Sequence, residues 1–351
     1  MDNAAAVFVD APVAEGHGDR PALATPSGAV SYVQLQRLTD RAGRALRALG
    51  VEPEQRVAML LSDGPAWAAI FFAALKLGAV AVPLNTRLAG ADLATVLADC
   101  RPKALVTDRS SARADLGSLD PGLVLDFEAL LAEAPAGPLP PEPVGADAMA
   151  FWLYTSGTTG SPKAAVHCHR TLPACRHYGV EVLGVTTEDR IFATSKLFFA
   201  YALGNALLIP LFTRAVSYLH PGWPEPAGVV QVMREFRPTL FFSVPTVYAR
   251  LLRAELPAET FRSARLCVSA GERLPAEIYE AWRARFGVEV LDGIGATETV
   301  FMVLSNRPGR SRPGSSGEPV PGTEARIYPA QGGPSPVDGQ GQPVVDGEEG
   351  V

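Results

Sequence analysis

Short apolar segments alternate with helical segments through most of this chain of 351 residues. An apolar run followed by a helix, repeated along a chain, is typical of a parallel sheet covered by helices on both faces. The sequence therefore predicts a doubly wound α/β fold. The predicted strands are 56–61, 80–83, 104–107, 190–193, 215–219, 239–244, 265–269 and 288–291, and the predicted helices are 35–49, 65–77, 91–98, 172–178, 228–236, 245–252 and 275–286.

The domain organisation follows from length and from a break in composition. A prior of about 150 residues per domain favours two folding units. Residues 108–147 are rich in Ala, Gly and Pro, and we interpret them as a surface connection. We expect a first α/β unit over 1–147, in which residues 1–20 are weakly patterned and 22–32 form a hairpin, and a second unit over 148–310.

Composition excludes several classes of protein. A net charge of −6 without any basic run argues against nucleic acid as a partner. The longest apolar stretch, 67–82, is interrupted by Lys76 and Gly78 and is too short to span a bilayer, so no membrane association is expected. Four cysteines without CxxC spacing, and no signal peptide, indicate a reduced, cytoplasmic protein.

A loop rich in hydroxyl groups follows the apolar run 151–154 and ends at Lys163. Gly157 and Gly160 let backbone N–H groups turn inward, and the surrounding Thr and Ser hydroxyls add uncharged donors. Lys163 supplies a positive charge. The spacing differs from the common P-loop, in which the lysine directly follows a glycine and precedes a hydroxyl residue. The stretch nevertheless predicts a phosphate-binding loop.

The sequence Tyr154-Thr-Ser-Gly-Thr-Thr-Gly-Ser-Pro-Lys163 resembles the phosphate loop of the adenylate-forming enzymes, which include acyl-CoA and aryl-CoA ligases, peptide-synthetase adenylation domains and luciferases. Ala164 departs from the glycine usual in that family. The resemblance implies two doubly wound αβαβα subdomains and a small β-rich subdomain that begins over 311–351. It also implies that the loop holds the ATP triphosphate through Thr155, Ser156, Gly157, Thr158, Thr159, Gly160 and Lys163.

Two further polar segments follow predicted strands, at the strand ends where open parallel sheets bind ligands. They are 269–273 and 292–298, and both match the family in order and spacing. The resemblance implies that Thr297 contacts the α-phosphate and that Glu298, with Thr159, positions Mg²⁺, an ion that prefers oxygen ligands. It places adenine between two strips: Ala270, Gly271, Glu272 and Arg273 on one side, and Asp292, Gly293 and Ile294 on the other.

The segments 196–206, 292–298 and 304–309 look like the benzoate-CoA ligase branch, which includes hydroxybenzoate and anthranilate ligases. By that resemblance Ala200, Tyr201 and Gly295 line a slot for an aromatic carboxylic acid, and Phe301 and Met302 form its floor. Phe301 stands where the branch usually has His, which makes the floor more apolar. A flat slot of small and aromatic residues favours a planar ring over a flexible acyl chain.

The resemblance implies an ATP-dependent, AMP-forming aryl acid:CoA ligase, with Lys163, Thr297 and Glu298 as catalytic residues. An aryl-adenylating unit that loads a carrier protein, and a nucleotide-binding module without catalysis, remain as alternatives, and the sequence leaves a homodimer open. Residues 345–351 look like the start of the family's next motif, so we expect an N-terminal part that lacks the C-terminal domain and is weakly active alone. His167-Cys-His169 is interpreted as structural or phosphate-side rather than as a metal site.

Overall fold

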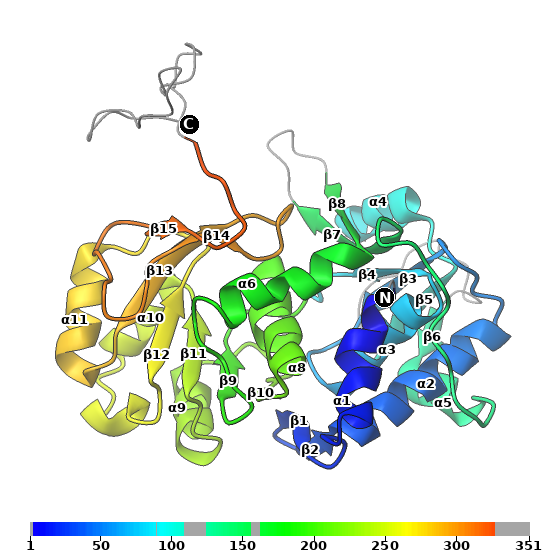
Figure 1. Ribbon diagram of the computed structural model, residues 1–351, viewed down its shortest axis with the longest axis horizontal. Coiled ribbons are helices and arrows are strands. Elements are labelled where there is room, and N and C mark those ends of the chain that lie inside the picture. The colour runs from blue at the N-terminus through cyan, green and yellow to red at the C-terminus, as the bar shows by residue number, and fades with distance from the viewer. Residues whose placement is uncertain (1–2, 89, 109–123, 156–161, 327–351) are drawn as a thin grey trace, which may run out of the picture.

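The computed structural model describes residues 3–88, 90–108, 124–155 and 162–326. Within these residues the strands form two sheets, which lie on opposite sides of the molecule (Figure 1). The six-stranded sheet has the order β6 (Val124–Asp126), β5 (Ala104–Thr107), β3 (Arg56–Leu60), β4 (Val80–Pro83), β7 (Met149–Thr155) and β8 (Lys163–Cys168). The nine-stranded sheet has the order β15 (Glu318–Pro319), β14 (Met302–Ser305), β13 (Val290–Gly295), β12 (Leu266–Ser269), β11 (Leu240–Ser243), β9 (Arg190–Ala193), β10 (Val216–Tyr218), β1 (Pro21–Thr25) and β2 (Gly28–Ser31).

Strands in the middle of both sheets run parallel, as the alternating sequence pattern predicts. In the nine-stranded sheet β10, β9, β11, β12 and β13 are parallel, and antiparallel strands lie only toward its ends. In the six-stranded sheet only β8 is antiparallel to its neighbour. The predicted mixed α/β fold is confirmed.

Helices cover both sheets and fill the space between them. They are η1 (Ala6–Asp10, a π-helix), α1 (Ala11–Ala14), α2 (Tyr32–Ala48), α3 (Pro65–Lys76), α4 (Gly90–Cys100), α5 (Phe127–Ala132), η3 (His169–Ala174), α6 (Cys175–Gly179), α7 (Ala200–Ala202), η4 (Leu203–Leu208, a π-helix), α8 (Ile209–Thr213), α9 (Pro226–Glu235), α10 (Pro245–Arg253), η5 (Ala258–Phe261) and α11 (Ala276–Phe286). Among the described residues, none of these helices combines the length and apolarity needed to cross a bilayer.

Three apolar cores explain the layers of the fold. Because strand side chains alternate between faces, Ala58 and Leu60 pack with α4 on the outer face of the six-stranded sheet, whereas Val57 and Met59 point into the central core. The central core contains residues of α2, α3, α6 and α8 and the inner faces of both sheets. A third core joins the outer face of the nine-stranded sheet to α9, α10 and α11, which Figure 1 shows beside β11–β13.

Local signals set the ends of the predicted helix 35–49. In the structure α2 begins earlier, because the Ser31 hydroxyl accepts the Gln34 N–H while the Gln34 side chain accepts the Ser31 N–H, a capping box. Gly50 follows the helix with φ +78°, a conformation in which glycine carries no steric penalty. The prediction that Gly50 ends this helix is confirmed.

The first residues of the chain are ordered more firmly than their weak pattern predicts. Phe8 in η1 is fully buried and stacks on Phe72 of α3 at 5.8 Å between ring centroids. The Asn3 amide donates to the carbonyl of Leu75 at 2.7 Å, and the Ala4 N–H donates to Nδ1 of His169 at 3.0 Å. These contacts hold the N-terminal segment against the central core.

The sheets do not follow the expected boundary between residues 147 and 148. Strands β7 and β8, which flank the phosphate loop, belong to the six-stranded sheet because β7 pairs with β4 through Phe151 and Ala81. The β1–β2 hairpin joins the nine-stranded sheet through β10, with Leu23 opposite Ser217. The phosphate loop therefore does not begin the second sheet, and the division into folding units stays a prediction.

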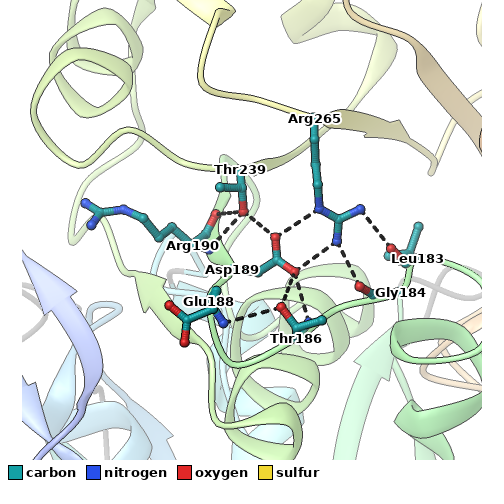
Figure 2. A network of polar contacts seen from close by, with 8 residues as sticks. All are labelled: Leu183, Gly184, Thr186, Glu188, Asp189, Arg190, Thr239 and Arg265. Atoms are coloured by element: carbon teal, nitrogen blue, oxygen red, sulfur yellow. Dashed lines mark hydrogen bonds and ion pairs between the residues drawn. The ribbon is translucent and has the colours of Figure 1, made fainter.

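A buried carboxylate fixes the end of the nine-stranded sheet where β9 and β11 begin (Figure 2). Asp189 accepts two hydrogen bonds from Arg265, both at 3.0 Å, and one from the Thr239 hydroxyl at 2.6 Å. Arg265 also donates to the carbonyls of Leu183 and Gly184. Burial raises the pKa of Asp189, but these donors outweigh it and hold the pKa below its usual value.

Candidate functional site

A cavity of about 580 Å³ lies where the carboxyl ends of β9, β11, β12 and β13 meet. This is the edge at which parallel sheets bind ligands, and the volume is within the range of sites for small molecules. The lining residues are Ser195, Phe199, Ala200, Tyr201, Asn205, Trp223, Val244, Ala270, Gly271, Glu272, Gly295, Ala296, Thr297, Val300, Phe301 and Met302. They include all five residues predicted for the aryl slot and four of those predicted for the nucleotide.

Tyr201 lines the cavity, and its hydroxyl is hydrogen-bonded to the backbone. The oxygen lies 3.1 Å from the carbonyl oxygen of Ser243 and 3.0 Å from that of Val268, at the ends of β11 and in β12. Burial raises the pKa of Tyr201 well above its usual value, so the phenol keeps the proton that it donates to these carbonyls. The cavity therefore meets the aromatic ring of Tyr201.

The floor is a close contact between Phe301 and the π-helix η4. A methyl group added at Gly204 would lie 3.0 Å from Cδ1 of the Phe301 ring, so glycine at this position makes room for the ring. Val300, which precedes Phe301, is buried and has φ +64°, an unfavourable conformation for a β-branched residue. Backbone of this kind is concentrated at functional sites.

The turn with Thr297 and Glu298 lies between β13 and β14. The Thr299 hydroxyl holds it by accepting the Ala296 N–H at 3.2 Å and donating to the Ala296 carbonyl at 3.0 Å. Thr297 is half-buried on the cavity wall, and Glu298 is exposed. Residues 292–295 were predicted to follow a strand that ends at 291, but they continue β13, because Gly293 and Ile294 pair with Ser305 and Leu304 of β14.

The predicted phosphate loop joins the antiparallel strands β7 and β8. Thr155 lies opposite Lys163 in the strand register, and the Lys163 side chain is exposed. Ser156, Gly157, Thr158, Thr159 and Gly160 lie outside the described residues.

A second cavity of about 400 Å³ adjoins the hairpin and is lined by Thr155, Leu88 and Tyr154, among others. Phe199 and Thr297 line this cavity and the first one, so the two cavities meet at these residues.

The predicted adenine strips occupy neighbouring strand ends. Ala270 is buried directly after β12, whereas Glu272 and Arg273 are exposed. Asp292 is buried in β13, where Oδ2 accepts the Leu274 N–H at 3.4 Å. Burial raises the pKa of Asp292 to about 6, against the opposing effect of that N–H. Ile294 is 49% exposed, so its side chain is available to a ligand.

The two histidines after the phosphate loop have separate surroundings. His167 is buried and stacks on Phe151 at 4.6 Å, and the pKa of its ring is lowered by burial although the Thr297 backbone and Glu298 act to raise it. His169 accepts the Ala4 N–H, and burial lowers its pKa to about 4. Both rings therefore stay neutral near pH 7. No group of three or more His, Cys, Asp and Glu suited to a metal occurs in the described parts of the chain.

Sequence analysis missed a buried ion pair beside the aryl slot. Asp63, after β3, accepts the Leu197 N–H at 3.2 Å (Oδ1) and 3.3 Å (Oδ2), and its Oδ2 lies 3.7 Å from Nζ of Lys196. Lys196 also donates to the carbonyl of His220 at 2.6 Å. The pair ties the six-stranded sheet to the segment that carries Phe198 to Tyr201. Isolated polar residues 133 positions apart give no sequence signal for such a contact.

The cavity wall also contains an aromatic residue that the sequence did not single out. Trp223 lines the cavity, and the Arg87 guanidinium lies 4.0 Å from the centroid of its ring. Phe199 packs near Trp223 at 6.5 Å between centroids and is 45% exposed. Trp223 lies in a segment rich in Pro and Gly. Such a segment predicts a turn, so the sequence does not indicate that the Trp223 side chain lines a cavity.

Comparison with known proteins identifies the family of this chain. The profile of a family described as AMP-binding enzyme matches residues 11–351. A 3-hydroxybenzoate–CoA ligase from Aromatoleum sp. (strain CIB) is 40% identical over 347 residues, which are 94% of this chain and 66% of that protein. The chain thus spans about two thirds of the length of this relative.

Two solved structures share the fold. A benzoate CoA ligase from Burkholderia xenovorans LB400 has a TM-score of 0.88 and 36% identity, over 99% of this chain and 70% of that one. An anthranilate CoA ligase solved in complex with anthranoyl-AMP also has a TM-score of 0.88, with 33% identity over 99% of this chain and 67% of that one.

Proposed function

We propose that this chain, which belongs to the AMP-binding enzyme family, is the ATP-binding and aryl-binding part of an AMP-forming aryl acid:CoA ligase. The observation that carries the proposal is the cavity at the carboxyl ends of β9, β11, β12 and β13, which unites the residues predicted for the ring with those predicted for the nucleotide. The relatives named for benzoate, 3-hydroxybenzoate and anthranilate support an aromatic acid as substrate.

The reaction has two steps. A carboxylate oxygen of the aryl acid attacks the α-phosphorus of ATP, and pyrophosphate leaves as the aryl adenylate forms. A thiol then attacks the carbonyl carbon of the adenylate, loses its proton and displaces AMP, which leaves a thioester. No protein nucleophile is required, so the contribution of the chain is to orient the reactants and to stabilise negative charge on phosphate oxygens.

The roles proposed for the protein follow the positions of its side chains. Ala200, Tyr201 and Gly295 hold the ring between apolar surfaces, and Phe301 and Met302 close the far end. Thr297, on the wall shared by the two cavities, contacts the α-phosphate. Lys163 and Thr155, with Ser156, Gly157, Thr158, Thr159 and Gly160, bind the β- and γ-phosphates.

Adenine occupies the strips at the ends of β12 and β13, which are Ala270 to Arg273 on one side and Asp292 to Ile294 on the other. The buried Ala270 provides an apolar surface for the base, and the exposed side chain of Ile294 provides another. Asp292 is the buried polar residue between these strips.

Mg²⁺ is proposed to bind at Glu298, with Thr159. The exposed carboxylate of Glu298 beside Thr297 fits this ion, which proteins bind through one or two carboxylates together with substrate phosphates. When bound, the ion would neutralise charge on the phosphate oxygens. Glu298 holds the ion next to the phosphates, and the Thr299 hydrogen bonds to Ala296 keep the turn in place.

The thiol of the second step is proposed to come from CoA, and a phosphopantetheine on a carrier protein is the alternative acceptor. The second cavity meets the aryl cavity at Phe199 and Thr297, which provides a separate approach to the adenylate carbonyl. Both acceptors end in the same pantetheine arm, so measuring thioester formation with CoA and with a loaded carrier protein, in a chain extended past Val351, distinguishes them.

The proposed function is tested by calorimetry with this chain, ATP and Mg²⁺. The ligands are benzoate, the hydroxybenzoates, anthranilate, hexanoate and phenylalanine, because a cavity lined by small and aromatic residues favours aryl acids. Binding of hexanoate or phenylalanine in preference to every aryl acid would overturn the aryl assignment. Ala200→Leu should abolish aryl binding by filling the slot, whereas Ala284→Leu, on an exposed position of α11, is the matched control.

A further inference from the structure

One polar side chain on the wall of the aryl cavity is almost fully buried. Of the other polar residues that line the cavity, Ser195 and Thr297 are half-buried and Glu272 is exposed, so all three are more accessible to water than Asn205. Asn205 is 4% exposed and lies in η4, next to Gly204, whose Cα faces the Phe301 ring. Asn205 is therefore a nearly buried polar residue of this cavity, and it follows the glycine that contacts Phe301.

The orientation of the Asn205 amide is fixed by its own helix. Nδ2 lies 2.8 Å from the carbonyl oxygen of Tyr201. A carbonyl can only accept a hydrogen bond, so the atom placed there must be the NH₂ group and the other must be the oxygen. This contact leaves Asn205 with Oδ1, an acceptor, as the atom that remains for a ligand.

Oδ1 of Asn205 has no hydrogen-bond partner within the described residues, yet it is not a buried, unpaired atom. Asn205 retains a small accessible surface, and the cavity that it lines is the aryl cavity. The Tyr201 hydroxyl, another polar group on the same residue wall, is already hydrogen-bonded to the carbonyls of Ser243 and Val268. Phe301 and Met302 offer no strong donor or acceptor.

We propose that the aromatic acid carries a hydrogen-bond donor on its ring, a hydroxyl or an amino group, and that Asn205 selects it by accepting that hydrogen bond through Oδ1. The inference rests on the proposed function and names the substrate class of the same site. Asn205 is a specificity-determining residue in this account, because Oδ1 contacts a ring substituent and not the reacting carboxylate.

Because Oδ1 of Asn205 only accepts hydrogen bonds, it should favour a ring substituent that donates one over a substituent that only accepts. A hydroxyl or amino group satisfies Oδ1, whereas a fluorine or a methoxy oxygen at the same ring position places an acceptor against an acceptor. A hydrogen atom there leaves Oδ1 without a partner after water has been displaced. A site built to hydrogen-bond a substituent discriminates strongly against an analogue that lacks the donor. We expect a preference on the order of tenfold to a hundredfold.

The test uses aryl-sulfamoyl adenosines, stable analogues of the aryl adenylate, with this chain as it exists. Dissociation constants are measured by calorimetry for the unsubstituted ring and for hydroxyl, amino, fluoro and methoxy substituents at each ring position. The expected result is tenfold or tighter binding of the hydroxyl or amino compound at one ring position, relative to the fluoro and unsubstituted compounds. Equal affinity of the donor and fluoro compounds at every position would overturn the proposal.

Asn205→Leu, which removes the acceptor at similar volume, extends the test. The preference for the donor should fall to within about twofold in this variant while the unsubstituted compound still binds. A preference that persists in Asn205→Leu would assign the selection to another residue and overturn the role of Asn205. The wild-type comparison of matched ligands stands by itself if the variant does not fold.

The outcomes also separate this inference from the proposed function. If no aryl-sulfamoyl adenosine binds more tightly than sulfamoyl adenosine without a ring, the aryl site itself is refuted. If the aryl compounds bind and the donor has no advantage, the aryl site stands and only the selection by Asn205 is refuted.

Discussion

The ion pair of Asp63 and Lys196 predicts an unusual dependence of stability on pH. Burial raises the pKa of Asp63 to about 6, although Lys196 and the Leu197 N–H act to lower it. Burial likewise lowers the pKa of Lys196, against the effect of Asp63 and with a further decrease from Arg87. The attraction between the two charges therefore does not fully compensate for their removal from water.

The magnitude follows from the difference between folded and unfolded pKa values of Asp63. The ordinary value is 3.8 and the value in the fold is about 6, and at about 1.4 kcal/mol for each unit the difference corresponds to about 3 kcal/mol. Because the folded pKa is the higher one, this stabilisation is complete below pH 3.8 and is lost as the pH rises through about 6. Asp63→Asn removes the titrating group.

The assay is urea unfolding of wild type and Asp63→Asn between about pH 4 and pH 7. Relative to the variant, wild type should lose roughly 2.5 kcal/mol over this interval, because part of the unfolded-state carboxyl is already ionised at pH 4. Asp189→Asn is the matched control with the opposite sign: Arg265 and Thr239 hold the pKa of Asp189 below its usual value, so its stabilisation is lost as the pH falls. The reasoning would be refuted if the free energy of unfolding of wild type, relative to that of Asp63→Asn, stayed constant or increased as the pH rises.

Three other substitutions test separate parts of the structure. Phe8→Ala should lower the free energy of unfolding by about 3–5 kcal/mol, because the ring is fully buried against Phe72; a urea-unfolding loss below about 1 kcal/mol would show that the N-terminal segment is not docked. Tyr201→Phe should lower the free energy of unfolding by about 1 kcal/mol in the same assay. If it instead reduced the affinity for analogues of the aryl adenylate more than it reduced stability, the hydroxyl would face the ligand. Lys163→Met should weaken ATP binding in calorimetry while stability changes by less than about 0.5 kcal/mol, since the side chain is exposed; unchanged ATP affinity would remove Lys163 from the site.

The parts of the fold that could be predicted are those with a local cause. The strand 80–83 was predicted with the same bounds as β4. All four residues are buried, and a strand buried on both faces is a continuous apolar run whose ends are visible in the sequence. Gly50 ends α2 through its own backbone conformation. Parallel strands end at one edge of a sheet, which explains why residues far apart in sequence, such as Ala200 and Gly295, line one cavity there. Their assignment to an aryl slot came from the family resemblance and stays a prediction.

The remaining features depend on partners distant in the chain. The sequence of β1 predicts a hairpin with β2, but nothing in it names β10 as the next strand. Asp292 to Gly295 has turn-forming residues, and pairing with β14 overrides that preference. The segment 6–14 is apolar on most sides and contains Pro12, so it shows no helical period although the core orders it.

The position of the β1–β2 hairpin has a consequence for how the chain can come apart. This hairpin comes from the beginning of the chain and lies in the nine-stranded sheet, whereas the six-stranded sheet contains the consecutive strands β3 to β8. If the β1–β2 hairpin detached, β10 would present unpaired N–H and C=O groups, a template for aggregation. The β1–β2 hairpin thus covers the edge of β10 as well as connecting the beginning of the chain to the nine-stranded sheet, and this protection lasts only while the hairpin stays paired.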